Sequence, residues 1–202
     1  MPLSYLALGD SYTIGEGVEE AGRWPVQLAR ALRDEGVPLA DPKIIATTGW
    51  TTDELDDAIS AAEPLGTYDF VSLLIGVNNQ YRGRSREQYR VQFAALLWRA
   101  VGLTGNRPNR VLVLSFPDWG VTPFAARSGR DLDQVTRETD AFNAAAQEAC
   151  ALRGIRYLDI TPVSRERGAE PAMLADDGLH PSAAMYALWT QAALPVALGM
   201  LR

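Results

Sequence analysis

The sequence predicts one α/β domain, spanning residues 1–202, in which helices cover both faces of a parallel sheet. Short apolar runs alternate with helical patterns along the chain, and such alternation favours a three-layer α/β/α sandwich with right-handed crossovers. Two of the runs, FVSLLI at residues 70–75 and VLVLSF at residues 111–116, are nearly continuous in apolar residues. Runs of this kind suit strands that are buried on both faces of a parallel sheet. The length of 202 residues fits a single large core.

Five strands are expected from these apolar runs. They are Tyr5–Leu8, Ile44–Ala46, Phe70–Ile75, Val111–Phe116 and Ile155–Ile160.

Helical patterns lie between and after the strands, at residues 24–35, 52–62, 85–101, 131–152 and 182–198. The first has Pro25 near its start and Gly36 just beyond its end, which is the usual asymmetry of helix termini. Ser85 and Gln88 form a capping-box pattern at the start of the third. Pro195 is expected to end or kink the last helix early.

Composition narrows the classes of function. The net charge is −6 and the isoelectric point about 4.9, which argues against nucleic acid as a partner because phosphate binding needs clustered Lys and Arg. A single cysteine, Cys150, and a single histidine, His180, cannot build a Cys-Cys-His-His zinc site. No segment reads as a membrane span or targeting peptide. We therefore expect a cytoplasmic protein with a small-molecule partner and neither cofactor nor metal.

The loops that follow the strands hold the chemistry. Ligands of open parallel sheets bind beyond the carboxyl ends of the strands, and the loops there contain Ser11, Gly49, Asn78 and, at the end of the loop after the fifth strand, Asp177 and His180. A serine attacks an acyl carbon only when a base takes its proton, and His180 is the one imidazole present.

The remaining parts of an acyl-transfer site also stand at these strand ends. Asp177, three residues before His180 in a turn that contains Gly178, can fold back to orient the ring, although Asp176 competes for this role. The backbone N–H groups of Ser11 and Gly49, with the Asn78 amide, can stabilise an oxyanion. The sequence thus predicts a Ser11–His180–Asp177 triad with an oxyanion hole from Ser11, Gly49 and Asn78.

These residues also carry a family resemblance. GDSYTIG at residues 9–15, the glycine of TTGWT, GVNN at 76–79 and DGLHPS at 177–182 resemble, in order, the four signature blocks of the SGNH/GDSL hydrolases. The resemblance implies a flavodoxin-like fold with strand order 2-1-3-4-5 and the same five site residues. Many members have Asp after the motif Asn, where this chain has Asn79. The nucleophile pattern differs from the G-x-S-x-G of α/β-hydrolases.

The substrate is less constrained. We expect hydrolysis of carboxylic esters through an acyl-enzyme, with thioesters or acetylated sugars as further possibilities. The predicted substrate contacts are Asp10, Trp50, Asn79 and Trp119, and Tyr81 and Phe124 could also line an acyl or sugar pocket. The absence of an inserted helical lid, and walls that mix aromatic residues with arginines, favour short acyl chains. Arg82, Arg84 and Arg86 read as a solvated loop, with an anionic substrate as the alternative.

Two other functions stay open at this stage. An acyltransferase or thioesterase would use the same triad, with an alcohol in place of water as acceptor or a thioester as donor. A non-catalytic flavodoxin-like binding module would use the first loop to hold a phosphate or flavin. Such a module has no need of a histidine and carboxylate that return to the first loop, which favours the hydrolase.

Overall fold

The five predicted strands form one parallel sheet. In the computed structural model, which describes residues 2–202, the strand order is β2-β1-β3-β4-β5, as the resemblance implied. The strands are β1 Tyr5–Gly9, β2 Lys43–Ala46, β3 Phe70–Leu74, β4 Val111–Leu114 and β5 Arg156–Leu158. The three central strands are buried at every position, which explains why two of them are nearly continuous apolar runs.

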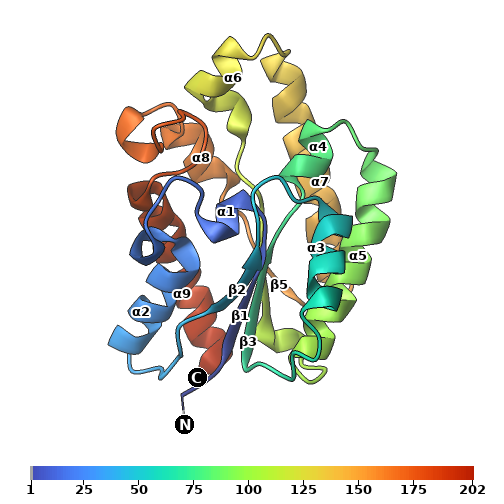
Figure 1. The fold of residues 1–202 in the computed structure, drawn as a ribbon, viewed down its shortest axis with the longest axis vertical. Coiled ribbons are helices and arrows are strands. Elements are labelled where there is room, and N and C mark those ends of the chain that lie inside the picture. The colour runs from blue at the N-terminus through green and yellow to red at the C-terminus, as the bar shows by residue number, and fades with distance from the viewer. Residues whose placement is uncertain (1) are drawn as a thin grey trace.

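Helices cover the sheet on both faces (Figure 1). The long ones are α2 Trp24–Asp34, α3 Thr52–Ala61, α5 Arg86–Leu103, α7 Leu132–Ala151 and α9 Ala183–Leu201. α2 and α9 pack together on one face, and α3, α5 and α7 cover the other (Figure 1). The predicted three-layer α/β/α sandwich is confirmed.

Short helices follow the strands and were not predicted. They are α1 Ser11–Ile14, α4 Val77–Tyr81, α6 Pro123–Arg127 and α8 Thr161–Arg167, with 3₁₀ turns at Glu20–Gly22, Pro108–Arg110, Trp119–Val121 and Pro171–Met173. Helices of four to seven residues span too few turns to show a 3.6-residue period. Two of them, α1 and α4, carry predicted site residues.

The last helix corrects two sequence predictions. α9 continues through Pro195 to Leu201, although a proline inside a helix costs about 3 kcal/mol. Residues on both sides of it, Ala193 and Ala197, are fully buried, so tertiary packing outweighs this cost. α9 is also the one helix of residues 2–202 that is long and apolar enough to cross a membrane, with mean hydropathy 1.3. This differs from the expectation that no segment reads as a membrane span, and the packing of α9 against α2 gives its apolar residues a place in the core.

Candidate active site

Ser11 lies directly beyond the carboxyl end of β1, as the first residue of α1. The preceding Asp10 caps this helix, because its carboxylate accepts the N–H of Tyr12 at 3.0 Å. The N–H of a first helical residue has no partner within the helix, so the backbone of Ser11 keeps a free donor beside its own hydroxyl. Ser11 is nearly buried, yet it lines a cavity at this edge of the sheet.

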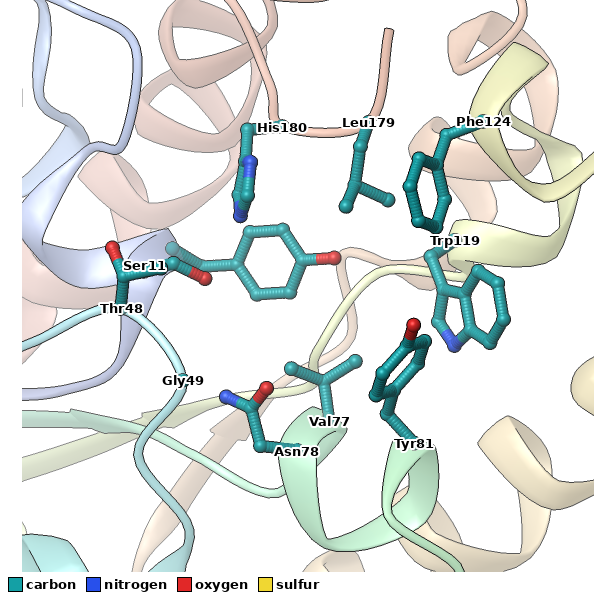
Figure 2. A pocket seen from close by; sticks show the side chains of 11 residues that line it. Ser11, Thr48, Gly49, Val77, Asn78, Tyr81, Trp119, Phe124, Leu179 and His180 are labelled. Carbon is teal, nitrogen blue, oxygen red and sulfur yellow. The ribbon is translucent and has the colours of Figure 1, made fainter. Parts of the chain in front are cut away.

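His180 reaches the same cavity from the far end of the chain. Its ring points toward Ser11 (Figure 2), and its Nδ1 lies 2.5 Å from Oδ2 of Asp177. The second oxygen of Asp177 accepts the N–H groups of Leu179 and His180 at 2.8 and 2.9 Å. With Nδ1 engaged, Nε2 is the nitrogen available to Ser11. Of the two adjacent acids, Asp177 rather than Asp176 makes this contact.

The environment of Asp177 favours its ionised form. Partial burial pushes the pKa of this carboxyl upward, but the hydrogen bonds from the ring and backbone of His180 and from Leu179 outweigh that effect and hold the pKa below its usual range. A carboxylate that stays charged can stabilise an imidazolium when His180 takes up a proton.

Gly49 and Asn78 line the cavity opposite His180 (Figure 2). Gly49 has φ of +89°, a conformation that glycine adopts without strain. Asn78, the second residue of α4, donates one amide hydrogen to the carbonyl of Trp50 at 2.9 Å. Since a side-chain amide has two donors, one N–H remains for a ligand.

The cavity is small, and it has a polar end and an apolar end. It measures about 200 Å³, below the roughly 300–1,000 Å³ of ordinary small-molecule sites. Its polar end holds the residues described above, together with Thr48. Its apolar end is formed by Val77, Tyr81, Trp119, Phe124 and Leu179 (Figure 2). Tyr12 also lines the cavity. No arginine is among its lining residues, but the guanidinium of Arg130 lies 4.3 Å from the centre of the Tyr81 ring and 5.6 Å from that of Trp119.

The four predicted substrate contacts divide into two groups. Trp119 lines the cavity, while Trp50 does not line it and contributes the carbonyl that accepts a hydrogen bond from Asn78. Asp10 and Asn79 are completely buried and do not line the cavity. Asn79 instead bonds to the backbone N–H and hydroxyl of Thr52, at 3.1 and 2.7 Å. In this arrangement the side chains of Asp10 and Asn79 hold backbone in place, at Tyr12 and Thr52.

Four lining residues were missed by sequence reasoning. Tyr12, Thr48, Val77 and Leu179 are each a chain neighbour of a motif residue. That adjacency was the available signal, because a residue beside a motif residue in a tight turn shares its end of the sheet. Two arginines of the loop after α4 are not simply solvated. Arg82 and Arg84 form hydrogen bonds with the segment that follows β2.

The sequence profile of the GDSL-like lipase/acylhydrolase family matches residues 7–188. The chain belongs to this family. The match covers the end of β1 with Ser11, the segments of Gly49 and Asn78, and the segment of Asp177 and His180, so the features above lie within the family domain. No curated protein matches the sequence significantly.

Solved structures share the fold of this GDSL-like hydrolase. A lipase/acylhydrolase from Enterococcus faecalis superposes with a TM-score of 0.75 at 18% identity, over 100% of this chain and 98% of the other. TesA gives 0.74 at 20% identity, over 98% and 99% of the two chains. An acetyl xylan esterase from Geobacillus stearothermophilus gives 0.73 at 18% identity, over 96% and 94%. At these identities the likeness establishes the fold.

Proposed function

We propose that this GDSL-like hydrolase cleaves carboxylic esters of short acyl chains through a Ser11–His180–Asp177 triad and an acyl-enzyme intermediate. One observation carries the proposal: a histidine held by a carboxylate at 2.5 Å opens onto the same cavity as a serine at the carboxyl end of the central sheet. Family membership and the esterases among the structural neighbours support the same reaction class.

The first step forms the acyl-enzyme. Nε2 of His180 takes the proton of the Ser11 hydroxyl while the oxygen attacks the ester carbon, and Asp177 stabilises the imidazolium. The carbonyl oxygen becomes an oxyanion, which accepts hydrogen bonds from the N–H groups of Ser11 and Gly49 and from the second N–H of Asn78. His180 then returns the proton to the leaving alcohol as the carbon–oxygen bond breaks.

The second step repeats this chemistry with water. Water adds to the acyl carbon of the intermediate, His180 accepts its proton, and the carboxylic acid leaves as Ser11 regains a hydrogen. The apolar end of the cavity suits the acyl group because each buried methylene contributes about 0.8 kcal/mol. A volume of about 200 Å³ accommodates few of them.

The test is a panel of p-nitrophenyl esters, a thioester and an acetylated carbohydrate, with the wild type and Ser11→Ala as matched proteins. We expect the wild type to release acid and alcohol from short esters, and Ser11→Ala to fall near the uncatalysed rate. Equal turnover by the two proteins would show that Ser11 is not the nucleophile. Acyl transfer to an added alcohol in preference to water would identify an acyltransferase, and the absence of turnover on the whole panel would favour a binding module.

A further inference from the structure

The two predicted oxyanion donors outside the nucleophile helix come from separate loops. Gly49 lies in the loop between β2 and α3, and Asn78 lies on α4, which follows β3. The strands before them, β2 and β3, both pair with β1 but not with each other. Contacts between the two segments beyond these strands therefore help to fix the donors relative to each other. An oxyanion hole works only when its donors are fixed before charge develops.

Polar contacts join the two segments along their length. Asn78 donates to the Trp50 carbonyl, Asn79 bonds Thr52, Arg82 contacts Gly49 and Glu54, and Arg84 pairs with Asp53. Four side chains of residues 78–84 thus contact the neighbouring segment 49–54. One of these contacts reaches the oxyanion glycine itself.

That contact is made by Arg82. Its Nη2 donates to the carbonyl oxygen of Gly49 at 2.5 Å, and its Nη1 lies 3.3 Å from the carboxylate of Glu54. Glu54 in turn accepts both the N–H and the hydroxyl of Thr51, each at 2.8 Å. The guanidinium therefore closes a ring from Gly49 through Arg82 and Glu54 to Thr51, only two residues further along the chain.

Gly49 needs such support because glycine rotates more freely than any other residue about its backbone bonds. The fixed planar geometry of a guanidinium suits it to bridge a carbonyl and a carboxylate, and hydrogen bonds from a charged donor are about twice as strong as neutral ones. On the other side of the glycine, the hydroxyl of Thr48 donates to Glu16. The peptide groups around Gly49 are thus restrained from both directions.

We propose that Arg82 is a positioning residue that orients Gly49 for transition-state stabilisation without touching the substrate. This inference rests on the proposed function, since the orientation matters only if Ser11 generates an oxyanion. Arg82 does not line the cavity, which separates its role from substrate binding. Its side chain is 42% exposed, and exposed ion pairs contribute little to stability, so removing it should leave the fold intact.

The test compares Arg82→Ala with Arg84→Ala. Both remove an arginine of the same segment that pairs with an acid of α3, but only Arg82 reaches Gly49. With a short p-nitrophenyl ester, we expect Arg82→Ala to lower kcat by about 10-fold to 100-fold with KM nearly unchanged, because small displacements in a site cost rates of this order. Arg84→Ala should keep the kcat of the wild type, and both should keep its melting temperature.

Chemical rescue sharpens the test. Guanidinium chloride at a sub-denaturing concentration should restore part of the kcat of Arg82→Ala, while sodium chloride at equal ionic strength should not. A rise in KM alone, an equal loss in Arg84→Ala, or no rescue by guanidinium would each overturn the role of Arg82. Failure of the proposed function is distinguishable, because the wild type would then itself lack Ser11-dependent turnover.

Discussion

The proposed nucleophile, Ser11, and its proposed base, His180, are held by two very different regions of the molecule. Ser11 follows β1 with one residue between, and the backbone before it is fully buried in the centre of the sheet. His180 stands at the end of a long stretch that leaves the sheet after β5 and passes through α8. Asp177, which orients it, has 43% of its side chain exposed.

Backbone hydrogen bonds close the return segment, residues 172–182, mainly on itself, and one of them connects it to α6. Ala175 donates to the carbonyl of His180 at 2.8 Å, Ser182 donates to Met173 at 2.9 Å, and Phe124 donates to Gly178 at 3.1 Å. The region of Ser11 is thus held by the packing of the core, and the region of His180 is held by hydrogen bonds within its turns. Changes in the His180 region should affect catalysis without affecting stability, whereas changes behind Ser11 should affect both.

The largest expected effect joins the two regions. Ser11→Ala and His180→Ala should each reduce kcat by about 10⁴-fold or more, and the double variant should lose little beyond either, because triad members act as a unit. Steady-state kinetics on a short ester, with melting temperatures as the fold control, measures this. Additive losses in the double variant would mean that the two regions do not cooperate.

Asn78→Ala should have the next largest effect. We expect kcat to fall by roughly 10²–10³-fold with a smaller change in KM, because an oxyanion donor acts mainly in the transition state. The matched variant Asn78→Asp keeps the size of the side chain but replaces the donor with a negative charge, and it should be at least as impaired. An increase in KM at constant kcat would instead make Asn78 a substrate-binding group.

The same contrast explains what could be predicted from the sequence. β1, β3 and β4 are apolar runs, which are recognisable in the sequence. Ser11, Gly49 and Asn78 follow strand ends closely, and the carboxyl ends of parallel strands meet at one edge of the sheet, so their convergence could be predicted. The burial of Asp10 and Asn79 could not be read in this way, since it depends on contacts with distant elements. The roles of Arg82 and Pro195 were missed for the same reason.

Acyl-chain length tests the cavity rather than the triad. For p-nitrophenyl esters, kcat/KM should peak at about two to six acyl carbons and fall beyond, because the cavity measures only about 200 Å³ and bulky, buried Trp119 lines its apolar end. Trp119→Ala is the matched variant, since its larger cavity should move the optimum to longer chains. A steady rise to long chains in the wild type would show that the acyl group takes another path.

A smaller effect is expected from the ionisation of Asp10, which should change the stability of the protein with pH. Burial raises the pKa of this carboxyl to about 7 despite the hydrogen bond from Tyr12, whereas in an unfolded chain it is about 4. Between these values the native protein binds a proton that the unfolded protein releases, so the free energy of unfolding falls as pH rises and levels off above about pH 7. Asp10→Asn cannot ionise and should lose this slope.

The measurement is the melting temperature of Asp10→Asn and the wild type between about pH 5 and pH 8. As pH rises, the melting temperature of Asp10→Asn should increase by several degrees relative to that of the wild type. As the control, Asp176→Asn, in the exposed return segment, should show no such pH-dependent gain. Parallel curves for Asp10→Asn and the wild type would contradict the view that the nucleophile region is held by a neutral buried acid.

The central claim is that the two regions meet to activate Ser11, and the most direct measurement is covalent labelling by a fluorophosphonate. Such a probe is attacked by an activated serine and leaves a phosphonyl group on its oxygen. Intact mass and peptide mapping of the wild type, Ser11→Ala and His180→Ala locate and time the reaction. The account predicts one label on Ser11 in the wild type, none in Ser11→Ala and strongly slowed labelling in His180→Ala. Labelling at another residue, or at an undiminished rate without His180, would contradict it.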